Sequence, residues 1–251
     1  MRHLQGLCKR SPQECRRRDV YEFGVFSGRA LKAMAMFFAT ANMEVGEIWG
    51  FDSFQGIPQD APPSLHATER GPRGRWADII SRGGFAQGEF NLAAKLGAHG
   101  VQGAVARVAE YVNVTRPPMA AGSRVHLIAG FYNESLTPTL VRERGMAPAL
   151  YVDMDMDIYK SAFEVLDWLC VNKLMAKGTV LGYDDFNYGL TNFSRDGWLD
   201  GESRAHREIE DKWGLKVAVM PRAIISGSGS GWAFVVHEGG GCIADSVREI
   251  S

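Results

Sequence analysis

Strand-like and helix-like segments alternate along most of this 251-residue chain. Short apolar runs suited to buried strands are separated by stretches in which apolar residues recur at helical spacing, beginning with a helix that opens at Gly28. This alternation predicts a Rossmann-like α/β fold, in which helices cover both faces of a mostly parallel sheet. The expected strands are residues 20–26, 47–52, 124–129, 149–156, 178–184, 215–220 and 232–237.

The last two expected strands have a Gly-Ser-Gly-Ser-Gly run between them. Such a connection is typical of a hairpin, so we expect an antiparallel C-terminal edge to the sheet. With 45% hydrophobic and 23% charged residues, residues 1–251 suit one globular domain. Proline and glycine interrupt the pattern at residues 56–122, where we expect a partly helical lid or insertion.

The overall charge of the chain argues against a polyanionic partner. A formal net charge of −1 and a pI near 6.6 give no electrostatic footprint for nucleic acid or an anionic membrane. We therefore expect a small-molecule ligand, and the sequence leaves open assembly into a homo-oligomer. No stretch reaches the roughly 20 apolar residues of a membrane span and no secretory signal opens the chain, so we expect a cytoplasmic location.

The cysteines are scattered and form no Cys-x-x-Cys pair; they are Cys8, Cys15, Cys170 and Cys242. This spacing fits a reducing compartment better than a disulfide framework. We expect all four to be free thiols.

The first chemical motif is a strand that enters a glycine-punctuated turn and then a helix, Tyr21-Glu22-Phe-Gly24-Val-Phe-Ser27-Gly28. At the carboxyl edge of a doubly wound sheet, such a turn lets the backbone approach a ligand, and the helix N-terminus favours an anionic group. The Gly-x-x-x-Gly spacing suits a small carboxylate better than the pyrophosphate of a dinucleotide. The motif predicts a nucleotide-like cofactor, although any tight strand-to-helix turn also uses glycine.

Asp52 ends the expected second strand, about one βαβ unit after Glu22. Rossmann-like proteins use an acidic residue at this place to hydrogen-bond the ribose hydroxyls, and we expect the same of Asp52. The alternative is that Asp52 caps the next helix.

Two acidic clusters lie in apolar runs that are expected to be adjacent strands, namely Asp153, Asp155 and Asp157, and Asp184 with Asp185. Repulsion among crowded carboxylates raises their pKa values unless a cation or a proton lies between them. Because one helix joins the two strands, their carboxyl ends are expected side by side, so that Asp155 and Asp184 share one ion. Oxygen ligands without Cys or His indicate Mg²⁺ rather than zinc. The alternative is a set of helix caps and exposed loop acids.

Five motifs occur in order across about residues 19–237: Glu22-Phe-Gly-Val, Gly50-Phe-Asp52-Ser-Phe-Gln-Gly56-Ile-Pro58, Gly130-Phe-Tyr-Asn-Glu-Ser-Leu, Asp155-Met-Asp157-Ile-Tyr159-Lys-Ser161 and Asp184-Asp185-Phe. Together they resemble the macrocin O-methyltransferase family. The resemblance implies a class I methyltransferase fold with a seven-stranded sheet. It also implies S-adenosylmethionine and Mg²⁺ as cofactors, and a hydroxyl substrate, typically on a sugar of a natural product.

The motifs and the resemblance assign roles to individual residues. Asp155, Asp184 and Asp185 match the metal-binding acids of the family, and Asp157 matches the acid proposed as the base. His206 is the histidine that we consider as a rival base, because histidine is the commonest general base. The residues expected to bind the cofactor are Glu22, Gly24, Ser27, Gly28, Asp52, Ser53 and Gly130.

Two other functions remain open. In a metal-dependent glycosyltransferase, Asp155-x-Asp157 would hold Mn²⁺ and a nucleotide-sugar diphosphate, but the glycine turn after Glu22 would be unexplained. A non-catalytic relative would keep the fold and act as a binding partner. The retained acids at the two strand ends argue against that second alternative.

Overall fold

The computed structural model describes residues 2–58, 88, 90–97, 100–113, 124–186, 201–220, 232–238 and 240–242. Within them, one sheet has seven strands. In chain order these are β1 (Asp19–Phe23), β2 (Ile48–Asp52), β3 (Val125–Ala129), β4 (Ala149–Met154), β5 (Val180–Tyr183), β6 (Lys216–Val219) and β7 (Trp232–Glu238). Their spatial order across the sheet is β3-β2-β1-β4-β5-β7-β6.

The sheet is parallel except at one edge. β1 pairs in parallel with both β2 and β4, β2 pairs with β3, and β4 pairs with β5. β7 runs antiparallel to β5 and to β6. The predicted α/β sheet with an antiparallel C-terminal hairpin is therefore confirmed. The carboxyl ends of β1, β2, β4 and β5 meet along one edge of the sheet, where ligands bind in folds of this type.

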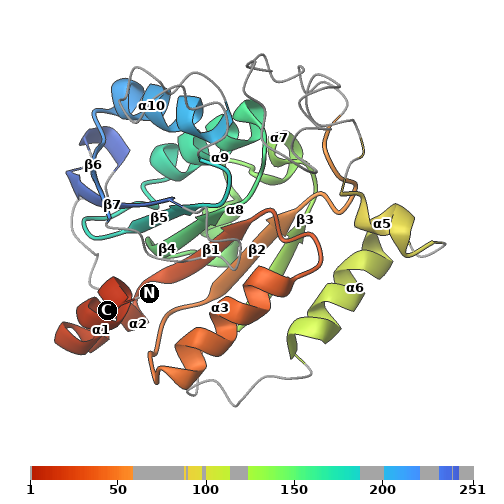
Figure 1. Cartoon of the computed structure of the whole chain (residues 1–251), viewed down its shortest axis with the longest axis horizontal. Coiled ribbons are helices and arrows are strands. Elements are labelled where there is room, and N and C mark those ends of the chain that lie inside the picture. The colour runs from red at the N-terminus through yellow and green to blue at the C-terminus, as the bar shows by residue number, and fades with distance from the viewer. Residues whose placement is uncertain are drawn as a thin grey trace, which may run out of the picture.

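Helices cover both faces of this sheet (Figure 1). Alternate residues of β1 point to opposite faces, so that Val20 packs in one hydrophobic core and Tyr21 in the other. The helices are α1 (Arg2–Arg10), α2 (Pro12–Arg16), α3 (Arg29–Thr40), α5 (Leu92–Lys95), α6 (Gly100–Asn113), α7 (Tyr132–Ser135), α8 (Leu140–Arg144), α9 (Tyr159–Val171), α10 (Gly201–Trp213) and the short 3₁₀ helix η2 (Gly240–Cys242). Of these, α3 and α6 pack in the core of Val20, and α9 and α10 pack in the core of Tyr21.

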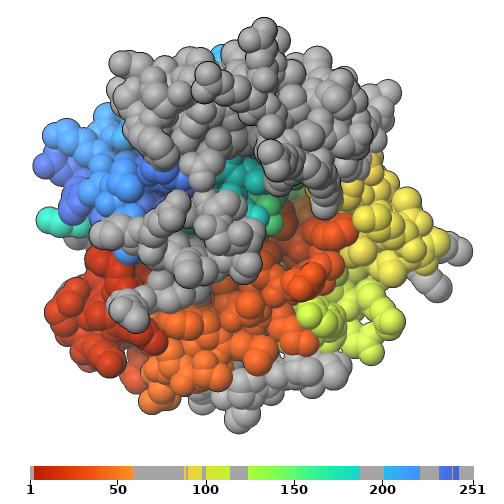
Figure 2. Space-filling model, in the orientation of Figure 1, coloured from red at the N-terminus to blue at the C-terminus, as the bar shows by residue number. Residues whose placement is uncertain are grey.

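The N-terminal helices α1 and α2 were not anticipated from the sequence. Leu4 and Cys15 are buried and join the same core as α3. On this face of the molecule, Figure 2 shows α3 at the surface between the N-terminal helices and α6. The lid expected at residues 56–122 falls largely on 59–87 and 114–123, outside the described residues, and stays a prediction. Its described part includes α6, a regular helix between β2 and β3.

β1 ends at Phe23, before the predicted end at residue 26, because the backbone turns there. Gly24 has a φ of +97° and Phe26 has a φ of +43°, and neither value belongs to an extended strand. The chain then enters α3 through Gly28, the N-cap residue, whose φ is +78°. The predicted turn between the first strand and its helix is thus present at the carboxyl edge of the sheet.

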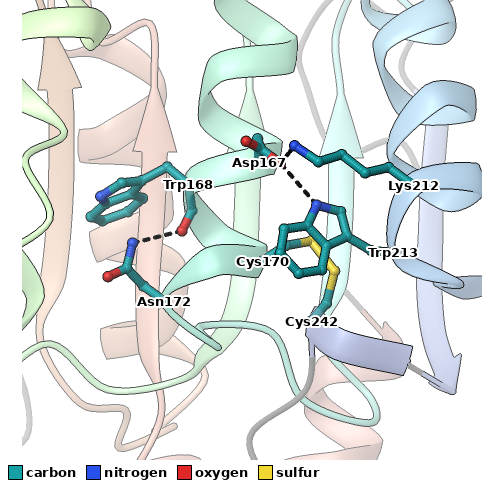
Figure 3. The surroundings of a disulfide bond; sticks show 7 residues. All are labelled: Asp167, Trp168, Cys170, Asn172, Lys212, Trp213 and Cys242. Atoms are coloured by element: carbon teal, nitrogen blue, oxygen red, sulfur yellow. Dashed lines mark hydrogen bonds and ion pairs between the residues drawn. A yellow bond between two sulfur atoms is a disulfide. The ribbon is translucent and has the colours of Figure 1, made fainter.

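The expectation of four free thiols is wrong. Cys8 is bonded to Cys15 and Cys170 to Cys242, across sequence separations of 7 and 72 residues. The second disulfide joins α9 to η2, as Figure 3 shows. The spacing of the cysteines in the sequence did not predict these disulfides. Pairing depends on which cysteines the packed helices bring within bonding distance.

The end of α10 lies beside this second disulfide (Figure 3). The carboxylate of Asp167 on α9 accepts a hydrogen bond from Lys212 Nζ at 2.6 Å and another from the Trp213 indole N–H at 2.8 Å. The disulfide and these two bonds fasten the C-terminal parts of α9, α10 and η2 to one another.

None of the described helices combines the length and apolar character needed to cross a membrane. The cytoplasmic location expected from the sequence stays a prediction.

Candidate active site

A cavity of about 480 Å³ opens at the carboxyl edge of the sheet. Its wall is formed by the loops that follow β1, β2, β3, β4 and β5 and by the first turn of α9. The predicted site residues that line it are Gly24, Asp52, Ser53, Gly130, Asp155, Asp157, Asp184 and Asp185. Parallel topology accounts for this convergence, because every parallel strand delivers its following loop to the same edge.

Three carboxylates meet in this cavity. Asp155, Asp157 and Asp185 each offer an oxygen within 4.8 Å of the other two, and we call these residues the acidic centre. Asp184 lines the same cavity beside Asp185. The sequence predicted that Asp155 and Asp184 share one ion; in the structure the carboxylate of Asp185 lies close to that of Asp155, and the shared ion stays a prediction. The acidic centre also contains Asp157, which the resemblance places as a base.

Backbone hydrogen bonds to neighbouring strands fix the two loops that carry the acidic centre. The Asp155 N–H donates to Phe23 O on β1 at 2.9 Å, and the Asp184 N–H donates to Met154 O on β4 at 3.1 Å. Asp157 has a φ of +63°, a conformation that costs about 1–2 kcal/mol for a residue with a Cβ. Strain at a residue that lines a cavity is typical of a functional site, where the surrounding structure fixes the side chain in place.

Burial and mutual repulsion raise the pKa values of the carboxylates in the acidic centre. Burial, followed by repulsion from Asp184 and Asp185, raises the pKa of Asp155 to about 8. Burial, followed by the neighbouring charge of Asp185, raises the pKa of Asp157 well above its usual range. Without a compensating charge these groups take up protons, and a bound cation would favour their ionised forms instead.

The acidic centre fits a hard divalent cation. All of its donors are carboxylate oxygens, the type that Mg²⁺ and Ca²⁺ prefer. Two oxygens on opposite sides of one such ion lie about 4–5 Å apart. The carboxylate oxygens of Asp155, Asp157 and Asp185 lie within 4.8 Å of one another, close enough to share an ion. The donor set and its spacing therefore suit such an ion.

Gly24 lets the turn after β1 reach the acidic centre. A Cβ on Gly24 would lie 1.8 Å from the backbone oxygen of Asp155, so no other residue fits without movement of the backbone. The glycine thus brings the turn after β1 against the loop that carries Asp155 and Asp157. A cofactor and a cation would be neighbours in this cavity.

Glu22 is buried at the end of β1, with 1% of its surface exposed. Neither of its carboxylate oxygens has a hydrogen-bond partner among the described residues. Burial, and then the charges of Asp153 and Asp155, raises the pKa of Glu22 well above its usual range. A buried carboxylate without partners is costly, and a cationic group of a ligand would compensate it. Glu22 itself does not line the cavity.

Asp52 fastens two loops at the edge of the cavity. Its carboxylate accepts hydrogen bonds from the N–H of Phe26 at 2.7 Å and from the N–H of Phe54 at 2.5 Å. Both donors belong to loops, so Asp52 does not cap the following helix. Each carboxylate oxygen accepts one of these bonds and has a second lone pair for a ligand hydroxyl.

Some predicted cofactor residues lie outside the cavity wall. Ser27 and Gly28 do not line it. A Cβ on Gly28 would lie 2.7 Å from Val108 Cγ1 on α6, which shows that this glycine serves helix packing. Asp153 is also absent from the wall, and its Oδ1 accepts a hydrogen bond from the Tyr151 hydroxyl at 2.8 Å.

His206 is part of the core and not of the cavity wall. It is 1% exposed, its Nδ1 lies 2.6 Å from the Tyr183 hydroxyl oxygen, and its ring centroid is 4.5 Å from that of Phe234. A base must reach the proton that it removes, and His206 is enclosed by aromatic rings. We therefore do not include it in the catalytic proposal.

Sequence reasoning missed several residues of the site. Tyr132 and Lys160 line the cavity, and both stand within quoted motifs, directly after Gly130-Phe and directly after Tyr159. Glu202 gave no signal in the sequence, because an acid in the first turn of a helix is common on helix dipole grounds alone. In the structure it is 1% exposed and lies beside the acidic centre.

Comparison with known proteins supports the fold. No protein-family model matches the chain, and no curated protein matches its sequence. The structure of the O-methyltransferase NovP is similar to this chain with a TM-score of 0.53, at 16% identity, over 91% of this chain and 79% of NovP. The calicheamicin methyltransferase CalS11 gives a TM-score of 0.48, at 20% identity, over 92% of this chain and 76% of that protein.

The fold is the Rossmann-like one of class I methyltransferases. The NovP comparison confirms this part of the expectation, together with the seven-stranded sheet. At such low identity the likeness speaks for the fold alone.

Proposed function

We propose that this protein is an S-adenosylmethionine-dependent, Mg²⁺-dependent O-methyltransferase that acts on a hydroxyl group of a natural-product sugar. One observation carries the proposal. In a fold of the methyltransferase type, the glycine turn after β1 and the acidic centre after β4 and β5 line one cavity. A methyl donor and a cation that holds the acceptor are both needed there, and they would be neighbours.

Each residue of the cavity has a role in this proposal. Asp155 and Asp185 of the acidic centre hold the cation together with the neighbouring Asp184. Asp157, the third member of the centre, takes the proton from the acceptor hydroxyl and is not a ligand of the cation. The cofactors supply an activated methyl group and a positive charge beside the acceptor oxygen. Gly24 admits the methionine end of the donor, and Asp52 with Ser53 and Gly130 faces its ribose. Glu22 is buried behind the cavity wall, shortly before the turn of Gly24, and acts on the ammonium group of the donor through its charge and not through contact.

The reaction requires alignment more than activation. The chain must hold the acceptor oxygen in line with the methyl group, and it must remove the proton as the new bond forms. Asp157 is suited to this second task because it lies in the cavity wall and offers a carboxylate oxygen within 4.8 Å of oxygens of Asp155 and Asp185. The surrounding structure holds the Asp157 backbone at a φ of +63° and so fixes the position of its carboxylate.

Calorimetric titration tests the proposal against the two alternatives. The ligands are S-adenosylmethionine, S-adenosylhomocysteine and a nucleotide sugar, each with and without Mg²⁺. We expect micromolar binding of the two adenosyl compounds and no binding of the nucleotide sugar. The reverse pattern would overturn the proposal in favour of a glycosyltransferase. A binding partner without activity would take up the adenosyl compounds but transfer no methyl group to any sugar-bearing, catecholic or polyol acceptor.

A further inference from the structure

Glu202 stands in the first turn of α10, a helix that packs against α9 on the same side of the sheet (Figure 1). Only 1% of its surface is exposed. Its Oε1 accepts a hydrogen bond from the Met156 N–H at 3.2 Å. Met156 lies between Asp155 and Asp157, so this bond holds the carboxylate of Glu202 directly against the loop of the acidic centre.

The second carboxylate oxygen of Glu202 is buried and has no hydrogen-bond partner among the described residues. The charged groups that act on Glu202 are all acids, first Asp185 and then Asp155 and Asp184. Glu202 in turn acts on Asp157. In the described part of the chain, no basic side chain pairs with it.

A buried carboxylate surrounded by other carboxylates is unfavourable unless a positive charge compensates it. We propose that Glu202 supports the divalent cation at the acidic centre through a bound water, because its carboxylate is buried against the same loop but is not one of the three whose oxygens lie within 4.8 Å of one another. The inference rests on the cation site of the proposed function. It adds a water-mediated contact from α10 to the acids that β4 and β5 provide, so that the cation fastens α10 to the edge of the sheet.

The competing explanation is purely structural. In that case Glu202 serves only to accept the Met156 N–H, and a glutamine serves as well, because its amide oxygen accepts the same bond. The two explanations differ in the affinity for a cation, which can be measured without cofactor or substrate.

The experiment is a titration of the metal-free protein with Mn²⁺, in which free Mn²⁺ is followed by electron paramagnetic resonance. We expect Glu202→Gln to weaken Mn²⁺ binding by about 10-fold to 100-fold. Asp211→Asn is the matched control, since Asp211 is exposed on the same helix and its substitution removes the same charge. We expect the control to bind Mn²⁺ as the unmodified protein does.

Thermal unfolding with and without Mn²⁺ gives a second readout. Because Glu202→Gln removes repulsion, the metal-free variant should melt no lower than the metal-free unmodified protein, and Mn²⁺ should raise its melting temperature by less. If Glu202→Gln does not fold, Glu202→Asp replaces it; this change keeps the charge but withdraws the oxygen, and it should also weaken Mn²⁺ binding.

Equal Mn²⁺ affinity of the unmodified protein and of the folded variant overturns the inference alone. Failure of the unmodified protein to bind Mn²⁺ overturns the inference and the cation part of the proposed function. Binding of S-adenosylmethionine, measured separately, decides the methyl-transfer part in either case.

Discussion

Gly24 shows how one residue determines whether the two halves of the site can meet. The closest approach of the β1 turn to the β4 loop is made at this residue, where a side chain would overlap the backbone of Asp155. Its positive φ would remain costly for any other residue even if space were available. Backbone atoms thus form the contact between the turn after β1 and the acidic centre.

We expect Gly24→Ala to lower the free energy of unfolding by about 3 kcal/mol or more, because clash and backbone strain add. Gly145→Ala is the control, since Gly145 also has a positive φ, +65°, but a Cβ there would meet nothing within 4 Å. The control should cost about 1 kcal/mol, from strain alone. Urea titrations of both variants measure the difference, and equal losses would contradict the close approach.

Asp155 makes the metal-free protein sensitive to pH. Its pKa of about 8 in the folded chain lies above that of an unfolded aspartate, so the folded state retains a proton that the unfolded state has lost between about pH 4 and pH 8. Its contribution to stability is therefore full below about pH 4 and is lost as the pH rises towards 8.

We expect the free energy of unfolding of the metal-free protein to fall from pH 5 to pH 8, by up to about 1.4 kcal/mol per pH unit from this one group. The melting temperature should fall with it. Asp155→Asn should flatten the profile, and saturating Mg²⁺ should flatten it as well, because the cation displaces the proton. Melting curves across this range in the presence of a chelator test this. A profile unchanged by Asp155→Asn would show that Asp155 is ionised throughout.

At the scale of helices and strands, the two disulfides join helices, which the hydrogen bonds of the sheet do not connect. The Cys8–Cys15 bond joins α1 and α2, which are adjacent in the sequence, whereas the Cys170–Cys242 bond joins α9 to η2 across 72 residues. Two buried disulfides are more typical of an oxidising compartment than of a reducing one. The compartment was predicted from cysteine spacing, and that argument no longer holds.

Replacing Cys170 and Cys242 by serine should destabilise the protein by about 4 kcal/mol, because a long loop gains much entropy in the unfolded chain when it is released. The equivalent replacement of Cys8 and Cys15 releases a short loop and should cost about 2 kcal/mol. Guanidinium unfolding of the two double variants gives both values. A larger loss for the Cys8–Cys15 pair would show that native packing, not loop entropy, governs these bonds.

At the scale of the whole molecule, the cavity joins loops from five strands, so that a ligand in it contacts much of the sheet edge. A compound that binds only the folded chain stabilises it in proportion to the logarithm of its concentration. Binding and global stability are therefore linked in this protein.

S-adenosylhomocysteine at 100 times its dissociation constant should raise the free energy of unfolding by about 2.7 kcal/mol. The rise should continue by about 1.4 kcal/mol for each further tenfold increase in concentration. Thermal melts over a concentration series check this, with adenosine and methionine added separately as controls. A flat series would show that the cavity does not bind the adenosyl compound.

The sequence alone determined the seven strands and the edge of the sheet at which the candidate site forms, but it did not indicate the N-terminal helices α1 and α2. Alternating periodicity specifies helix or strand locally, and parallel topology then brings loop residues such as Asp52, Asp155 and Asp185 to the same edge. No knowledge of packing was needed for these inferences.

Tertiary structure alone decided the features that depend on contacts between distant segments. It paired the cysteines, enclosed His206 among aromatic rings, turned Gly28 towards α6 and placed Glu202 beside the acidic centre. Each of these outcomes depends on which side chain of one element meets which side chain of another. Sequence periodicity identifies the buried face of a helix, but only packing identifies the partner of a given residue on it.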